Sequence, residues 1–208
     1  MSTKILKCGD RPISVIVPLA ANRRTFFNRY CKPLIQANGP KELIIVEGEG
    51  TAPGKRNAGA DKATQPFLFF CDDDIQLAGN CLEIMQTQMN PDDAYSYSNY
   101  QGWVRNPENY EWKKNFHHKA RTFDPAVLRQ KNFISTMSLI RTECFPGFDE
   151  DLERLQDWDL WLTIWDIHKK GGAWIDDTLF MAYYLDKGIS ANDNWNQARR
   201  AIAKKHKI

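Results

Sequence analysis

The amino-acid sequence predicts a single α/β domain with a mostly parallel central sheet flanked by helices. Three apolar runs have the length and composition of buried strands, at residues 13–17, 43–46 and 67–71. Helical patterns lie between these runs, and strands that alternate with helices usually form a parallel sheet. An acidic triplet, residues 72–74, directly follows the third run. Open α/β sheets bind ligands at the carboxyl ends of their strands, so we expect a ligand site there.

Length and composition agree with this class. The chain has 208 residues, of which 42% are hydrophobic and 12% aromatic, as in a folded protein of one domain. The net charge of +2 neither demands nor excludes a polyanionic partner. Five cysteines are widely spaced and include no C-x-x-C pair, which favours free thiols in a reducing compartment over disulfides or a zinc site.

Membrane and export signals are not evident in the sequence. The N-terminus has no apolar core of a signal peptide, and no run approaches the ~18 apolar residues of a membrane span. We therefore expect no membrane span and a cytoplasmic location.

Helices are expected at four places. Residues 54–64 read as a glycine-led loop that enters a short helix, and Asn80 is a candidate N-cap for the next helix. Residues 152–168 carry tryptophans at helical spacing and apolar residues on a second face, which predicts a largely buried helix that ends at Gly171. Residues 195–202 begin a last amphipathic helix, which carries basic side chains.

The segment between these regions has a different character. Residues 94–123 are rich in tyrosine, tryptophan, asparagine and basic residues without clear period, and residues 132–141 return to a strand pattern. Aromatic rings interleaved with cations can grip single-stranded nucleic acid, cover a carbohydrate acceptor or form a solvated insertion. We favour the carbohydrate loop, and we expect His117 and His118 to belong to it rather than to bind a metal ion.

The acidic triplet has two interpretations. Asp72 and Asp74 are two residues apart, so their side chains share a face of an extended chain and can converge on one ion in a turn. Hard oxygen ligands suit Mg²⁺ or Mn²⁺. The alternative is a solvated acidic turn that stabilises the N-terminus of the following helix. The triplet alone does not choose between them.

Four segments, in this order, resemble the family-2 glycosyltransferases of the GT-A fold. Residues 14–18 with Asn22-Arg23 resemble the opening strand and its P-x-Y-N-R end, and residues 56–59 are similar to the R-N-x-G helix start. The triplet stands where the D-x-D metal motif belongs. Residues 146–150 with 156–162 resemble the G-G-F-D-E … E-D-x-D-L-W-L stretch.

The resemblance implies roles for residues of the donor site. Asp72 and Asp74 would bind Mn²⁺ or Mg²⁺, and Arg56 would point into the same cleft as Asp72. Glu47 stands where the family commonly has the acid that binds the nucleotide base, in a segment that reads E-G-E-G here instead of D-D-G-S. The full set of nucleotide-binding residues implied in this way is Pro18, Glu47, Arg56, Asp72 and Asp73.

Asp157 matches the acid that the family uses as general base. It begins a mostly apolar helix, where partial desolvation would raise its pKa towards useful basicity. Gln156 and Trp158 are the candidate acceptor-binding residues, whereas Asp159 reads as an acid that stabilises the helix dipole. One base without a separate nucleophile implies direct displacement with inversion. Residues 183–186 only faintly echo the Y-R-x-H segment, which elsewhere supplies a further metal ligand.

The sequence thus predicts an inverting, metal-dependent glycosyltransferase. Its donor would be a nucleotide-diphosphate sugar, and its acceptor would be a carbohydrate or another hydroxyl compound. A hydroxymethylated DNA base is also a possible acceptor, but a nucleic acid partner is not favoured. The alternatives are a nucleotidyltransferase and a non-catalytic sugar-nucleotide-binding protein of the same fold. We expect one domain over residues 1–208, with a nucleotide-sugar-binding half at 1–93, an acceptor-binding and catalytic half at 94–190 and a basic helix at 191–208.

Overall fold

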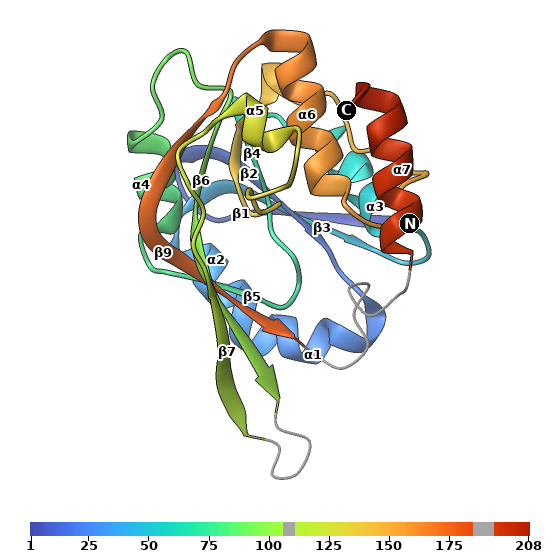
Figure 1. Cartoon of the computed structure of the whole chain (residues 1–208). Helices are drawn as coiled ribbons and strands as arrows, with labels where there is room; N and C mark the ends of the chain where they lie inside the picture. The colour runs from blue at the N-terminus through green and yellow to red at the C-terminus, as the bar shows by residue number, and fades with distance from the viewer. Residues whose placement is uncertain (106–110, 185–193) are drawn as a thin grey trace.

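The computed structural model describes residues 1–105, 111–184 and 194–208, apart from the side chain of residue 105. It has the predicted α/β class: helices lie on both sides of one curled sheet (Figure 1). The strands, in their order across the sheet, are β1 (Ser2–Lys7), β3 (Pro40–Glu47), β2 (Arg11–Pro18), β4 (Phe67–Phe70), β8 (Leu139–Arg141), β6 (Tyr95–Arg105), β9 (Gly172–Tyr184) and β5 (Ile75–Leu77), with β7 (Trp112–His118) paired to β6.

The strand directions follow from the pairings. β2 is parallel to β3 and β4, and β6 is parallel to β9, whereas β8 lies antiparallel between β4 and β6. Therefore β2, β3, β4, β6 and β9 point the same way, while β1, β5, β7 and β8 point the opposite way. The carboxyl ends of β2, β3 and β4 meet at one edge of the sheet.

Helices and short helical turns connect the strands. A continuous helical segment follows β2 and consists of η1 (Ala21–Arg23), α1 (Arg24–Phe26), η2 (Phe27–Cys31) and α2 (Lys32–Ala37). The others are α3 (Ala52–Ala60), α4 (Cys81–Thr87), α5 (Pro125–Leu128), η3 (Thr142–Cys144), α6 (Gln156–His168) and α7 (Trp195–His206).

Alternate residues of the central strands pack into two cores, because successive side chains of a strand point to opposite faces of the sheet. Val15 and Val17 of β2 belong to one cluster, together with buried residues of η2, α2 and α4. Ile16 of β2 belongs to the other, together with buried residues of α5, α6 and α7. The sheet is therefore covered on both faces, which explains why its central strands read as continuous apolar runs.

Three expected boundaries differ from the structure. α3 begins at Ala52, before the expected loop at 54–64, because the Thr51 hydroxyl caps the helix by accepting a hydrogen bond from the Gly54 amide. α6 begins at Gln156 instead of 152, since Leu155 has a positive φ of 58° and interrupts the helical path. Within the expected strand at 132–141, only the last three residues form β8.

Most of the aromatic and basic segment that the structure describes forms strands, where a loop was expected. β6 and β7 make a long antiparallel pair that extends away from the body of the molecule (Figure 1). Gly102 permits this pairing, because a Cβ there would lie 2.5 Å from the ring of Phe116. His117 and His118 end β7. Tyr110, also part of the segment, lies outside the described residues.

Two further sequence expectations concern membranes and thiols. No helix among the described residues is long and apolar enough to cross a bilayer. The five cysteines are free, as expected; Cys8 is half-buried, and the buried ones are Cys31, Cys71, Cys81 and Cys144.

Candidate active site

A pocket of about 1290 Å³ lies at the carboxyl ends of β2 and β4. The segment after β2, the start of α3 and the acidic triplet form one side of it. The loop at 132–137, the start of α6 and the ends of β6 and β9 form the other side. Residues from both predicted halves of the chain therefore face one cavity, which is large enough for a nucleotide-sized ligand.

Two arginines and one backbone amide contact the carboxylates of the triplet. Asp73 is buried and accepts hydrogen bonds from the Ala20 amide at 2.8 Å and from Arg23 Nη1 at 2.9 Å. The same guanidinium contacts Asp74 Oδ2 at 2.6 Å. Arg56 Nη2 donates to Asp72 Oδ1 at 2.5 Å. Asp73 thus fixes the chain that follows β2, and all three acids line the pocket.

The backbone around the triplet is held by a distant strand. The amide of Tyr183, in β9, donates to the carbonyl oxygen of Asp74 at 3.0 Å. β5 follows the triplet at once and pairs with β9, so that the turn is fixed on both sides. The three acids therefore lie in a defined turn between β4 and β5, and not in a solvated loop.

Two carboxylates of this turn have raised pKa values. Burial and the neighbouring charge of Asp72 raise the pKa of Asp74 to about 7, although Arg23 opposes the shift. Burial also raises the pKa of Asp73. A divalent ion would relieve the repulsion among these carboxylates. Asp72 and Asp74 supply hard oxygen ligands of the kind that Mg²⁺ and Mn²⁺ prefer, and the donor set therefore fits such an ion.

The metal shell would be incomplete with protein ligands alone. Within the ranges that the structure describes, no group of three or more histidine, cysteine, aspartate or glutamate side chains is arranged to hold a metal ion. Mg²⁺ sites commonly use one or two carboxylates and are completed by water and substrate phosphates. Residues 185–186, half of the segment expected to offer a third ligand, lie outside the described residues.

Arg56 connects the acidic turn to α6. It lies in α3, is 6% exposed, and reaches Asp72 with one nitrogen and Gln156 Oε1 with the other at 3.0 Å. Its guanidinium also lies 5.3 Å from the ring centre of Phe148. The expected orientation of Arg56 into the same cleft as Asp72 is confirmed. A planar fork suits this bridging position, which a lysine could not fill.

Asp157 lines the same pocket from the first turn of α6. Its carboxylate accepts a hydrogen bond from the Trp158 amide at 2.9 Å. Burial raises the pKa of Asp157, whereas this hydrogen bond, the charge of Arg56 and a hydrogen bond from Asn132 lower it, and the net change is upward. A partly desolvated carboxylate that faces a cavity has the properties of a general base.

The sequence model described as glycosyl transferase family 2 matches residues 27–152, which is more than half of the chain. The chain belongs to glycosyl transferase family 2. No curated protein sequence matches the chain significantly.

Solved structures show the GT-A fold that this family uses. The chain is similar to S. aureus TarS 1–349, with a TM-score of 0.63, 14% identity, and coverage of 93% of this chain and 64% of that one. The complex of the same fragment with UDP-GlcNAc gives a TM-score of 0.62 at 14% identity, with coverage of 93% and 66%. A structure of a longer S. aureus TarS chain gives a TM-score of 0.65 at 14% identity, and the match covers 93% of this chain and 39% of that one. The chain thus spans less than two thirds of the length of these proteins.

Two residues expected at the acceptor site have other contacts in this family-2 protein. Trp158 is 3% exposed, belongs to the core cluster of α6, and donates its indole N–H to the Leu128 carbonyl oxygen at 2.6 Å. Its ring faces are therefore covered, and the expectation that it stacks on an acceptor is wrong. Gln156 contacts Arg56 and the Leu152 carbonyl oxygen, so that it organises the pocket wall.

The residues expected to bind a nucleotide have both expected and unexpected contacts. Pro18 lines the pocket as expected. Glu47 ends β3 and pairs with Arg24 at 2.7 Å, while Gly50 and Ala52 contribute the neighbouring pocket wall. A base-binding role for Glu47 is a proposal that rests on the family resemblance alone.

Several pocket residues were not found from the sequence. Tyr100 stacks on His118 at a centroid distance of 4.7 Å, and Tyr184 lines the same pocket. Asn132 lines the same pocket as Asp157. These residues come from β6, β7, β9 and a loop, and no local pattern marks them, since only the folded sheet brings them together.

Proposed function

We propose that the chain is an inverting, metal-dependent glycosyltransferase that uses a nucleotide-diphosphate sugar as donor and a hydroxyl group as acceptor. One observation carries the proposal: Asp157 faces the same pocket as Asp72 and Asp74, and Arg56 bridges the acidic turn to the helix of Asp157. The free cysteines fit a reducing compartment, and we propose the cytoplasm.

The pocket residues have complementary tasks in such a transfer. Asp72 and Asp74 would hold Mn²⁺ or Mg²⁺, which neutralises charge on a departing diphosphate when it is bound. Arg56 fixes the carboxylate of Asp72. Asp157 accepts the proton of the acceptor hydroxyl, whose oxygen forms the new bond to the anomeric carbon. The bond from that carbon to the diphosphate oxygen breaks, its electron pair leaves with the phosphate, and the configuration inverts.

The donor class is supported by the solved relatives. S. aureus TarS 1–349 was crystallised with UDP-GlcNAc and with UDP, and the chain has its fold. UDP-GlcNAc is therefore the first donor to test. The aromatic wall of Tyr100, His118 and Tyr184 next to Asp157 supports a carbohydrate acceptor, because sugar rings pack well on such rings.

The proposal is tested by UDP binding and UDP-GlcNAc hydrolysis, for which water replaces the unidentified acceptor. Calorimetry should show that UDP binds more tightly with Mn²⁺ than without it. Asp74→Asn should abolish this difference, because it removes one proposed ligand, while the exposed Asp92→Asn should preserve it. Binding without hydrolysis would indicate a non-catalytic protein. Equal UDP affinity with and without Mn²⁺ in the wild type would contradict the metal site.

A further inference from the structure

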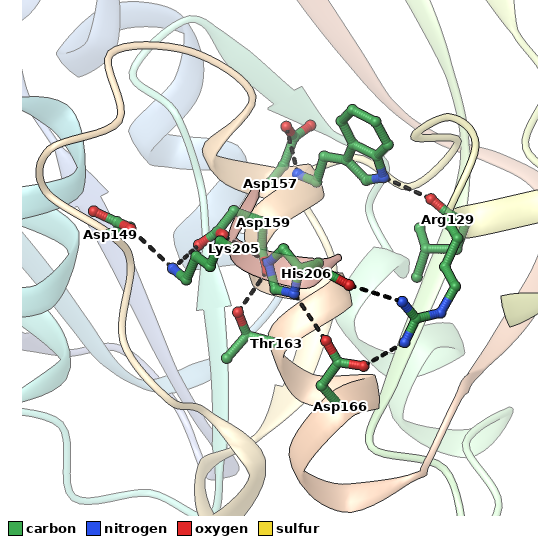
Figure 2. A network of polar contacts seen from close by, with 10 residues as sticks. Arg129, Asp149, Asp157, Asp159, Thr163, Asp166, Lys205 and His206 are labelled. Atoms are coloured by element: carbon green, nitrogen blue, oxygen red, sulfur yellow. Dashed lines mark hydrogen bonds and ion pairs between the residues drawn. The ribbon is translucent and has the colours of Figure 1, made fainter. Parts of the chain in front are cut away.

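The C-terminal helix α7 is attached to α6 by a buried ionic network (Figure 2). Asp159 of α6 is 2% exposed, and His206 of α7 is 7% exposed. Two buried apolar residues, Ala198 and Ile202, complete the contact surface of α7. Ionisable groups are rarely buried unless they are paired, so the partners of these two side chains decide what the contact does.

His206 lies between two carboxylates. Its Nε2 is 2.8 Å from Asp159 Oδ1, and its Nδ1 is 2.8 Å from Asp166 Oδ2. A neutral imidazole has one N–H donor and one acceptor nitrogen, whereas the imidazolium ion has two donors. Both contacts are favourable only when the ring is protonated. Loss of that proton would leave a lone pair facing a carboxylate oxygen.

Other ion pairs extend the network to two more segments. Lys205 Nζ contacts Asp159 at 2.9 Å and Asp149, in the loop before α6, at 2.8 Å. Arg129, which follows α5, contacts Asp166 at 2.6 Å and the His206 carbonyl oxygen at 3.1 Å. α7 thus ties α5, α6 and the loop before α6 together, as the dashed lines of Figure 2 show.

The network holds the turn that carries the proposed base. Asp157 and Asp159 lie in the first turn of α6, and Figure 2 shows them on the same short stretch of helix. Trp158, between them, donates to the carbonyl oxygen of Leu128, the neighbour of Arg129. Side chains on one side of this turn are therefore fixed by α5 and α7, while Asp157 faces the pocket on the other.

We propose that α7 is a positioning element for the transfer reaction: protonated His206 and Lys205 hold the first turn of α6 through Asp159, so that Asp157 keeps its place in the pocket. Proton loss from His206 loosens this hold. His206 and Lys205 are positioning residues, since they act through Asp159. The inference rests on the proposed function for its effect on turnover, whereas the effect on the α6 turn can be measured without it.

The direction of the pH dependence follows from the surroundings of His206. Burial alone would lower its pKa, but the hydrogen bonds to Asp159 and Asp166 outweigh burial and raise the pKa above the ordinary value of 6.5. The contribution of this contact to stability is therefore complete below 6.5 and is lost as the pH rises through the folded-state pKa. The charged groups of the network around the ring are Arg129, Asp149, Asp159, Asp166, Lys169 and Lys205.

Two variants and a matched control test the role in turnover. His206→Gln removes the charge and one donor, and Lys205→Gln removes the second cation; Lys204→Gln makes the same charge change at an exposed neighbour. We expect His206→Gln to hydrolyse UDP-GlcNAc about 10–100-fold more slowly, because a small displacement of a reacting group has effects of this size. UDP–Mn²⁺ affinity should change less than about twofold, and Lys204→Gln should match the wild type.

The pH profile separates positioning from simple stabilisation. Wild-type turnover should fall as the pH rises through the folded-state pKa of His206, at temperatures where circular dichroism shows a folded protein throughout. His206→Gln should lack this descending limb, and Lys205→Gln should keep it at a lower rate. A folded His206→Gln protein with wild-type turnover and pH profile would overturn the inference. If His206→Gln does not fold, then Lys205→Gln and the wild-type profile still decide it.

A measurement without substrate distinguishes this inference from the proposed function. Hydrogen exchange of the Trp158 and Asp159 amides should accelerate as His206 deprotonates. This acceleration should exceed the one that rising pH causes at the β3 amides, which serve as the reference for base-catalysed exchange. An unchanged exchange ratio between α6 and β3 across the titration would refute the hold of α7. If the wild type hydrolyses no UDP-GlcNAc at any pH and binds no UDP, the proposed UDP-sugar donor is wrong, while the exchange result stands for α7 itself.

Discussion

At the scale of single residues, Asp157 and Asp159 show how two acids in one helical turn acquire different roles. Asp157 faces the pocket, where the charge of Arg56 is nearby. Asp159 is buried against Lys205 and His206. An α-helix turns about 100° per residue, so that positions two apart face different surroundings. The two acids are close in the sequence, but their chemical surroundings differ.

Asp157→Asn and Asp159→Asn should therefore have different effects on turnover and stability. Asp157→Asn removes the proton acceptor, and we expect UDP-GlcNAc hydrolysis to fall ~10²–10⁴-fold while UDP–Mn²⁺ affinity is kept. Its melting temperature should not fall, because the raised pKa of Asp157 means that the charged form costs stability at neutral pH. Steady-state hydrolysis, calorimetry and thermal unfolding measure the three quantities.

Asp159→Asn is the matched comparison. It removes the carboxylate shared by Lys205 and His206, and breaking a buried ion pair costs about 3 kcal/mol or more. This loss corresponds to a decrease in melting temperature of ~6–12 °C. Turnover should fall about 10–100-fold, as in His206→Gln, because the same hold on the α6 turn is lost, and this loss is smaller than that expected for Asp157→Asn. Equal losses of turnover in the two variants, or a fully active Asp157→Asn, would place the base elsewhere.

The sequence predicted the residues whose neighbours are local and missed those whose neighbours are distant. Asp72 and Asp74 could be proposed because a buried strand ends directly before them. Trp158 was misplaced because its helical position is compatible with both a pocket and a core, and only packing against α5 decides between them. Arg23 matched the family motif, but its bonds to acids 50 and 51 residues away cannot be read from the sequence.

At the scale of elements, the close packing of α3 on the sheet places Arg56. Gly59 of α3 lies against Ile16 of β2, and a Cβ at this glycine would come within 2.4 Å of Ile16 Cγ2 and 3.3 Å of Val46 Cγ2. Branched side chains in a packed strand cannot move that far, so a larger residue would force the helix away from the sheet.

Gly59→Ala should consequently affect both stability and the donor site. Overpacking typically costs about 1–3 kcal/mol, which lowers the melting temperature, and displaced Arg56 should lose part of its contact with Asp72 and weaken UDP–Mn²⁺ binding. Gly79→Ala is the control, because a Cβ at Gly79 meets nothing within 4 Å. Wild-type stability and UDP affinity in Gly59→Ala would show that α3 is not closely packed here.

The elements differ in how well the sequence predicts them, for a physical reason. β2, β3 and β4 are covered on both faces, so their apolar runs are continuous and easily recognised. β6, β7 and β9 carry a bulged pairing and partly exposed faces, and their polar, aromatic sequences show no simple alternation. Boundaries such as the start of α6 depend on the backbone conformation of Leu155, which composition does not reveal.

At the scale of the whole molecule, the sheet joins the two predicted halves. β4, from the first half, pairs with β8 from the second, and β5 pairs with β9. The pocket is lined from both halves. Neither half has a complete set of strand partners by itself, so the two halves are parts of one folding unit.

Unfolding in urea should accordingly be a single cooperative transition. Far-ultraviolet circular dichroism and tryptophan fluorescence should give coincident curves, which is the usual test of two-state behaviour. A fragment of residues 1–93 should remain unfolded, because β4 and β5 would present unpaired edges. Two separated transitions, or a folded fragment, would show that the halves are independent domains.

The alkylation rates of two buried cysteines can report how a ligand stabilises the acidic turn. Cys71, directly before the acidic turn, lies in the core on one face of the sheet, and Cys144 lies in the core on the other. Burial raises the pKa of both thiols, so that alkylation must wait for local exposure. UDP with Mn²⁺ should slow labelling of Cys71 and leave Cys144 unchanged, as peptide mass spectrometry can measure. Equal protection of both would mean that the ligand stabilises the entire molecule, and a Cys71 rate unaffected by UDP and Mn²⁺ would mean that the ligand does not stabilise the acidic turn.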